Sequence, residues 1–148
     1  IIGLIFGVFP EIAVFMAAYI PLRSFAGGYH AQTPLRCYIF SVIMLIFVSI
    51  GMKYLSIEEW IYYVILAAAA LVVLILAPVE DRNKPLDEIE YKVYKRRTIL
   101  ISAVELTLAM LLKLLMLDDL FIATAYSFVV LSLMLIAGKA KNRFELSK

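Results

Sequence analysis

Long apolar segments separated by short polar stretches are the feature that most restricts how this 148-residue sequence folds. A transmembrane helix needs about 20 mostly apolar residues to cross roughly 30 Å of hydrocarbon. Five segments have a suitable length: residues 1–20, 35–55, 57–77, 98–117 and 120–137. The second of these, residues 35–55, reaches this length only when polar residues at its two ends are included. Hydrophobic residues make up 64% of the chain and charged residues 18%, whereas soluble domains are about half apolar and a quarter charged. We therefore expect an all-α polytopic transmembrane protein with five spans in this chain.

Basic residues gather in alternate polar segments and predict the orientation of these spans. Twelve of the 14 Lys and Arg residues lie in residues 21–36, 80–97 and 138–148. By the positive-inside rule, these three segments face the cytoplasm. Five spans would then leave residue 1 outside. We therefore expect the single domain, residues 1–148, to lack an N-terminal segment that adds a sixth span.

The residues that interrupt the apolar segments predict where helices begin and end. Pro10 is expected to kink or restart the first helix. Pro85 is expected to begin an interfacial helix that runs into the fourth span. We expect a tight turn at Asp118 and Asp119, and a basic tail that opens at Gly138.

A polar segment between the first two spans holds the only histidine and the only cysteine, His30 and Cys37. Thr33 followed by Pro34 predicts an N-cap and the first position of a helix, because proline's missing N–H is not needed there. Cys37 then falls at the end of the first helical turn. The free amide donors and the positive end of the helix dipole favour a thiolate at this place. The pattern is typical of a cysteine nucleophile.

The two glycines before the histidine, Gly27 and Gly28, allow a sharp turn. With the Thr-Pro break, the chain can fold back and bring His30 within about 3 Å of the thiol, as a general base requires. The alternative is that Cys37 is a packing residue and His30 an interfacial polar group, which is the usual role of such residues taken singly. A zinc site is excluded, because one His and one Cys cannot fill three or four ligand positions in a loop without carboxylates.

Two motifs resemble one known family. The pattern R-x-x-x-G-G-Y-H-A over residues 23–31, followed by Cys37, is similar to the AgrB family (accessory gene regulator protein B). Residues 76–85 resemble that family's Ala-Pro and Lys-Pro loop, with Lys84 in the second part. The family consists of integral-membrane cysteine endopeptidases of the bacterial cell membrane that process the AgrD quorum-sensing precursor. The resemblance implies that Cys37 is the nucleophile and His30 its base.

The resemblance also implies a reaction and partners. An AgrD-like precursor would form a thioester with Cys37, and its own Cys or Ser would displace the enzyme to close a thiolactone or lactone ring. The expected partners are this precursor, membrane lipids and a second copy of the chain, with no nucleic acid, metal or cofactor. The small residues 67–70 offer a face for close helix packing.

Other polar residues are candidates for supporting roles. The candidates for orienting His30 or stabilising an oxyanion are Gly28, Gln32 and Ser24. The candidates for contacting a substrate are Arg23, Arg36, Glu11, Glu105 and Lys84. A carboxyl at membrane depth is a functional candidate, although a satisfied packing carboxyl is the simpler interpretation of both glutamates.

A second class of protein fits the same sequence. The two glutamates and a kinked first span would also line a polar path through a small, non-enzymatic peptide transporter or export channel. Thiol reactivity distinguishes the two classes, because a catalytic cysteine reacts readily with a thiol probe and a packed one does not.

Overall fold

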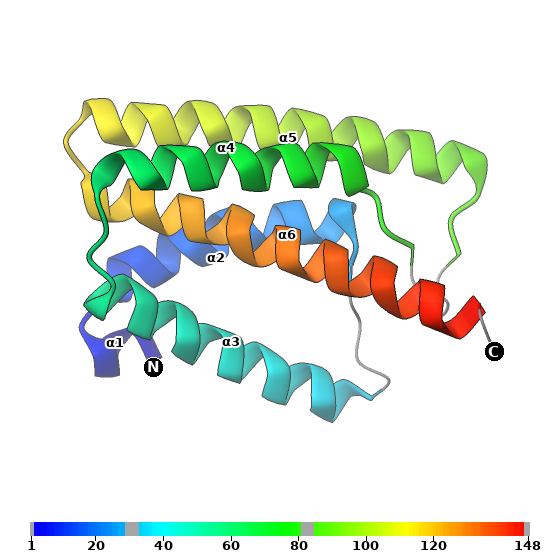
Figure 1. Cartoon of the computed structure of the whole chain (residues 1–148), viewed down its shortest axis with the longest axis horizontal. Helices are drawn as coiled ribbons and strands as arrows, with labels where there is room; N and C mark the ends of the chain where they lie inside the picture. The colour runs from blue at the N-terminus through cyan, green and yellow to red at the C-terminus, as the bar shows by residue number, and fades with distance from the viewer. Residues whose placement is uncertain (1, 29–32, 81–84, 147–148) are drawn as a thin grey trace.

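The computed structural model describes residues 2–28, 33–80 and 85–146, and these residues form six α-helices (Figure 1). The helices are α1 (Ile2–Phe6), α2 (Phe9–Ala26), α3 (Pro34–Tyr54), α4 (Glu59–Leu76), α5 (Glu88–Leu114) and α6 (Asp118–Leu146). The part of the chain that the structure describes contains no strand. The predicted all-α fold is confirmed.

The first predicted span is divided into α1 and α2, as the position of Pro10 indicated. α1 ends at Phe6, Gly7 takes a φ of 72°, and α2 begins at Phe9. Pro10 occupies the first turn of α2, where its missing N–H removes no helical hydrogen bond. Glu11 follows in the same turn, where the helix dipole favours a carboxylate.

The prediction that Pro85 begins a helix is wrong, because α5 begins at Glu88. The Asp87 side chain caps this helix by accepting hydrogen bonds of 2.8 Å from the Ile89 amide and 2.9 Å from the Glu90 amide. The Glu90 carboxylate in turn accepts a 3.4 Å bond from the Asp87 amide. This reciprocal capping box satisfies backbone donors that a start at Pro85 would leave unpaired.

Asp118 and Asp119 are the first residues of α6 and do not form the predicted tight turn. The chain reverses just before them, where Met116 has a φ of 59°. Carboxylates in a first helical turn are favoured by the helix dipole. The two aspartates therefore start the helix that follows the turn.

The basic tail that follows Gly138 is helical, because α6 continues through this residue to Leu146. A glycine inside a helix costs only about 1 kcal/mol relative to alanine. Leu135, one turn earlier, is fully buried, and Asn142, one turn later, donates a 2.7 Å hydrogen bond to the Glu80 carbonyl. Tertiary contacts on both sides of Gly138 therefore outweigh its low helix propensity.

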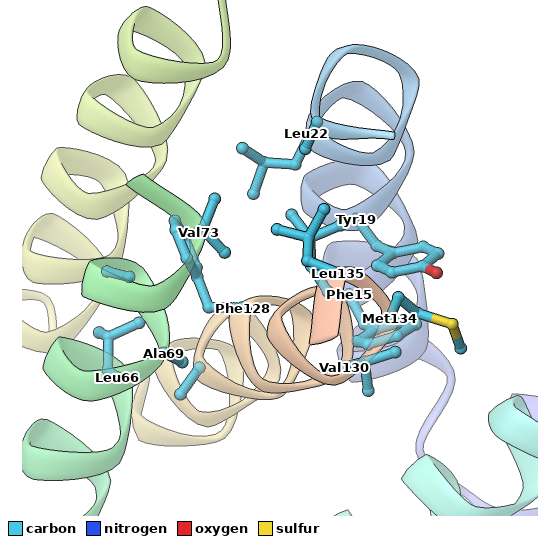
Figure 2. Close-up of a cluster of buried hydrophobic side chains, with 14 of the residues drawn as sticks. Phe15, Tyr19, Leu22, Leu66, Ala69, Val73, Phe128, Val130, Met134 and Leu135 are labelled. Carbon is cyan, nitrogen blue, oxygen red and sulfur yellow. The ribbon is translucent and has the colours of Figure 1, made fainter. Parts of the chain in front are cut away.

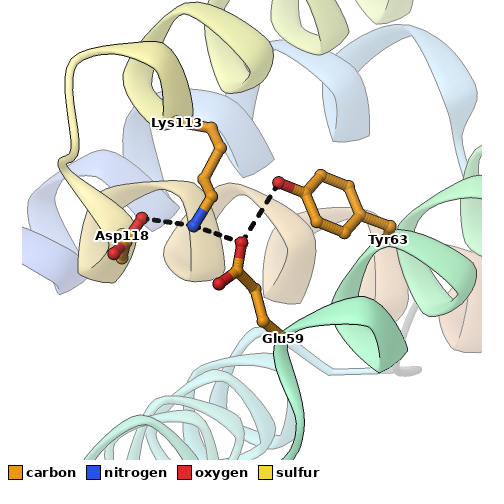
Figure 3. A network of polar contacts seen from close by, with 4 residues as sticks. All are labelled: Glu59, Tyr63, Lys113 and Asp118. Carbon is orange, nitrogen blue, oxygen red and sulfur yellow. Dashed lines mark hydrogen bonds and ion pairs between the residues drawn. The ribbon is translucent and has the colours of Figure 1, made fainter.

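A cluster of charged and aromatic side chains holds one end of the bundle (Figure 3). Lys113 Nζ lies 2.6 Å from Asp118 Oδ1 and 2.5 Å from Glu59 Oε1. The Tyr63 hydroxyl donates a 3.4 Å hydrogen bond to the same Glu59 oxygen. The cluster joins the end of α5 to the starts of α4 and α6, so it aligns the ends of these three helices.

The core lies around α6, which packs against α2 on one side and α4 on the other (Figure 2). Phe15, Phe121 and Phe128 are its largest fully buried side chains. Ala69 and Ala70 of α4 are also buried, and their small size lets α4 approach α6 closely. α5 packs on both α2 and α6. Part of the predicted small-residue face therefore packs within this chain.

α3 stands apart from the bundle along much of its length (Figure 1). Val48 and Ser49, in its second half, are buried. Gly51 approaches α6 so closely that an added Cβ would lie 2.8 Å from the Tyr126 hydroxyl. The exposed large apolar side chains of α3 are mostly in its first two-thirds: Leu35, Tyr38, Ile39, Phe40, Ile43 and Phe47. Such a surface suits hydrocarbon better than water.

Three helices of the described residues are long and apolar enough to cross a membrane. They are Leu35–Tyr54, Glu59–Leu76 and Asp118–Phe144, with mean hydropathies of 2.1, 2.3 and 2.3. The predicted membrane class is confirmed at this level. α2 and α5, which the sequence predicts as further spans, are not among the three.

Candidate active site

The polar segment predicted to hold the site starts later than expected, because α2 continues to Ala26. Leu22 and Ala26 are fully buried, and this packing keeps α2 helical beyond Pro21. Arg23 and Ser24 therefore lie in the last turns of α2 and not in a loop.

Both of these polar side chains bond to the backbone at the end of α2. The Ser24 hydroxyl donates a 2.8 Å hydrogen bond to the Ile20 carbonyl. The Arg23 guanidinium donates to the Gly27 carbonyl. In this arrangement they stabilise the helix end, and their predicted roles toward His30 or a substrate stay predictions.

Gly27 and Gly28 follow α2 with positive φ angles of 72° and 112°. The Val79 amide donates a 2.9 Å bond to the Ala26 carbonyl, and the Gly28 amide donates a 3.3 Å bond to the Val79 carbonyl. An added Cβ on Gly27 would overlap the Val79 carbonyl oxygen, and one on Gly28 would lie 3.1 Å from the Met134 carbonyl oxygen. Glycine is therefore needed at both positions for space as well as for φ. The two bonds join the two sequence motifs.

Lys95 of α5 holds the segment after α4 from another side. Its ammonium donates to the carbonyls of Leu74 and Ala77, the latter at 2.7 Å. Carbonyls at a helix end lack intrahelical partners, so Lys95 caps α4 from a neighbouring helix. In the sequence Lys95 is one of several adjacent basic residues, and its spacing does not distinguish it. We call residues 26–28 and 77–79, together with Lys95, the loop anchor.

Cys37 lies in the first turn of α3, as predicted. Thr33 is the N-cap, with Pro34 at the first helical position. The Thr33 hydroxyl oxygen accepts a 3.4 Å bond from the Arg36 amide, and its carbonyl accepts a 3.1 Å bond from the Cys37 amide. Cys37 is partly exposed, and its carbonyl accepts a 2.9 Å bond from the Ser41 hydroxyl. The cysteine is thus partly accessible in the first turn of α3, away from the half of this helix that packs against the bundle.

Three of the predicted site residues, His30, Gln32 and Lys84, lie outside the described residues. The pairing of His30 with Cys37 therefore stays a prediction. The described residues on either side of His30 are Gly28, in the loop anchor, and Thr33, at the cap of α3.

Glu11 and Glu105 lie on α2 and α5, which pack against each other. One oxygen of each carboxyl is buried and has no hydrogen-bond partner in the described part of the chain. Thr98 and Ser102 share the buried face of α5 with Glu105, and their hydroxyls also lack a partner there. Burying an unsatisfied polar group costs stability. Packing alone therefore does not account for this polar face of α5.

These features define a class of protein: an all-helical membrane protein with an accessible cysteine at the start of a helix of membrane-spanning length. Residues 1–137 match the family Accessory gene regulator B, and the chain belongs to this family. The Accessory gene regulator protein B of Staphylococcus saprophyticus is 33% identical over 98 residues, which cover 66% of this chain and 49% of that protein. The chain thus spans about half the length of this curated relative. No solved structure matches the chain.

Proposed function

We propose that this chain acts as a membrane cysteine endopeptidase that cleaves an AgrD-like precursor peptide and promotes its ring closure. Membership of the Accessory gene regulator B family supports this substrate class. The observation that carries the proposal is Cys37 itself, a partly exposed thiol in the first turn of α3, seven residues after the only histidine. The loop anchor supports it further, because it bonds the turn before His30 to the segment before Lys84.

The proposed reaction is an acyl transfer in two stages. Cys37 Sγ attacks the carbonyl carbon of the scissile peptide bond while His30 accepts the thiol proton. The C–N bond breaks, His30 returns the proton to the leaving amine, and the acyl group remains on Cys37 as a thioester. A Cys or Ser side chain of the precursor then attacks the thioester carbonyl. The Cys37 thiol leaves with a proton, and the peptide closes as a thiolactone or lactone.

Two of the supporting candidates, Gly28 and Arg36, differ in whether the group that would act in this reaction already forms a hydrogen bond. The Gly28 amide already donates to the Val79 carbonyl at 3.3 Å, so it must exchange that bond to stabilise an oxyanion. Arg36 is exposed next to Cys37, and this exposure supports a role in contacting a precursor that approaches the thiol.

The decisive experiment uses the purified chain in bilayers with a labelled precursor peptide. The unaltered chain should cleave it and accumulate a covalent acyl-enzyme, detected as added mass on the peptide that contains Cys37. Cys37→Ala should abolish both signals, whereas the matched variant Ser41→Ala, one turn along α3, should retain them. Cleavage by Cys37→Ala would require another nucleophile and would overturn the proposal.

The proposed membrane arrangement has five spans, with α2 and α5 crossing beside the three strongly apolar helices. The ends of α2, α4 and α6 and the starts of α3 and α5 lie at one end of the bundle (Figure 1). The three basic segments of the sequence adjoin this end, and we place it in the cytoplasm. Cysteine-accessibility mapping in intact cells, in a Cys37→Ala background, tests this placement. External labelling of a cysteine introduced at position 83 would refute it.

The homodimer implied by the family resemblance also stays a proposal. Ala69 and Ala70 pack within the chain, which leaves Ala67 and Ala68 exposed for a second copy. Cross-linking between cysteines introduced at position 68 in membranes tests this contact. A chain that stays monomeric with every linker length would count against it.

The polar face of α5 favours a second candidate function, movement of a peptide across the membrane. Glu105, Thr98 and Ser102 are buried, and each has an atom without a partner in the described chain. Polar groups of this kind mark transport paths in membrane proteins. Efflux of a labelled cyclic peptide from liposomes should then require Glu105 but not Cys37. Equal efflux from the unaltered chain and from Glu105→Leu would exclude this function.

A further inference from the structure

α6 extends beyond the end of α4 and forms a groove there. α4 ends at Leu76, whereas α6 continues to Leu146. The groove has a volume of about 710 Å³, and it is lined by Leu76, Ile136, Lys139, Ala140, Arg143 and Phe144. Five of these six residues belong to α6, and Leu76 is the last residue of α4.

The groove has an apolar part and a basic part. Ile136, Lys139, Ala140 and Arg143 follow one another at the spacing of a single helix face. Leu76 and Ile136 lie at the ends of apolar helical segments, whereas Lys139 and Arg143 are one and two turns further along α6. Neither basic side chain forms an ion pair with a carboxylate of the described residues. An apolar surface thus adjoins two positive charges that no carboxylate of the described residues pairs with.

We propose that this groove binds the headgroup of an anionic phospholipid, with the acyl chains against Leu76 and Ile136. Basic pockets between transmembrane helices at the cytoplasmic side are suited to such headgroups. The alternative occupant, an acidic peptide, would match the basic residues but would bring polar backbone groups against the apolar part, which acyl chains suit better. Ile136 is 48% exposed, so the apolar part is open to a lipid that approaches from the side.

The other basic surface at this end of the bundle provides a contrast. A smaller groove of about 310 Å³ is lined by Tyr91, Lys92, Lys95, Arg96, Ile99 and Leu100, all on α5. Lys95 already donates to two carbonyls of α4. With one basic residue engaged and a single helix as its wall, this groove is the weaker site. It supplies the matched control.

The test is a lipid titration of the full chain in detergent, with bound phosphatidylglycerol and phosphatidylcholine counted by native mass spectrometry. The chain should prefer phosphatidylglycerol. The double variant Lys139→Gln with Arg143→Gln should bind it about 30-fold more weakly, since each basic residue near a headgroup contributes roughly fivefold. Phosphatidylcholine binding should not change. The control double variant, Lys92→Gln with Arg96→Gln, should remain within about threefold of the unaltered chain.

Several results would overturn the lipid site. Equal binding of the two lipids would show that charge is not recognised. Equal losses in the two double variants would show general attraction to a basic surface. If soluble glycerol phosphate bound as tightly as the lipid, the acyl chains and the apolar part of the groove would contribute nothing to binding. An acidic peptide that binds at Lys139 and Arg143 more tightly than the lipid would assign the groove to a peptide. The charge-conserving double variant, Lys139→Arg with Arg143→Lys, should bind phosphatidylglycerol as tightly as the unaltered chain. A loss as large as that of the two glutamine substitutions would show that the positive charges are not what the lipid recognises.

Discussion

The two sides of the candidate site, the loop anchor and the first turn of α3, differ in how extensively they pack against the rest of the protein. On one side, Gly27 and Gly28 are enclosed by α6 and by the segment after α4, which Lys95 fastens. On the other side, Cys37 lies near the start of α3, where Leu35 and Tyr38 are each 68% exposed. One side is part of the bundle, and the other is carried by a helix that stands apart from it.

This difference suggests that stability and chemistry depend on different residues. The backbone hydrogen bonds and the close approach of glycines in the loop anchor contribute to folding. Cys37 is only partly buried, and Ser is close to it in size, so substitution by Ser should change reactivity with little effect on stability.

The largest expected effect is on chemistry and comes from the α3 side. Cys37→Ser should lower the rate of precursor cleavage by at least about 10⁴-fold, because a hydroxyl is a much weaker nucleophile than a thiol. Its free energy of unfolding should stay within about 0.5 kcal/mol of the unaltered chain. His30→Ala should be equally inactive in cleavage while Cys37 still reacts slowly with an alkylating probe. The cleavage rate and the free energy of unfolding are measured in the same bilayers. A large loss of stability in Cys37→Ser would show that the α3 side of the site also contributes to folding.

The next effect should come from the loop anchor. Gly27→Ala should lower the free energy of unfolding by about 3 kcal/mol, because alanine is strained at this φ and its Cβ overlaps the Val79 carbonyl. Gly7→Ala is a matched control, since Gly7 also has a φ of 72° but an added Cβ meets no atom within 4 Å. The control should lose only about 1–2 kcal/mol. Equal losses in the two variants would show that the contact with Val79 contributes nothing.

A smaller loss of stability is expected at Lys95. Lys95→Met keeps the length of the side chain but leaves the carbonyls of Leu74 and Ala77 without their charged donor. The free energy of unfolding should fall by about 2 kcal/mol. Lys92→Met, at an exposed position on the same helix, should change it by less than about 0.5 kcal/mol. Chemical unfolding in detergent measures both free energies. Identical values for the two variants would show that the bonds from Lys95 to the α4 carbonyls do not contribute to stability.

The smallest effect is expected at Arg36. Its side chain is exposed, and its backbone amide, which the substitution keeps, donates to the Thr33 hydroxyl oxygen. Arg36→Ala should therefore leave stability unchanged, and cleavage should fall by no more than about tenfold, since the side chain acts only through its charge. A loss as large as that of Cys37→Ser would place Arg36 in the chemistry itself.

Local rules in the sequence determined the class of fold and several details of the site. Apolar length and composition are enough to predict membrane helices, because hydrocarbon admits few other structures. Pro10 restarts α2, and the Thr33–Pro34 step places Cys37 in the first turn of α3, because caps and proline act on neighbouring residues. The start of α5 is also encoded locally, since Asp87 and Glu90 have the spacing of a capping box. This cap, and not Pro85, determines where the helix begins.

Only the tertiary structure decided how the motifs meet. The bond between Gly28 and Val79 joins residues 51 positions apart, and no local periodicity reports such a pairing. Lys95 is distinguished from neighbouring basic residues only by the carbonyls of α4 that it reaches. Gly138 stays helical because contacts from Leu135 and Asn142 outweigh its propensity. These features depend on groups brought together from distant parts of the chain, whereas the sequence alone determines what each segment does beside its immediate neighbours.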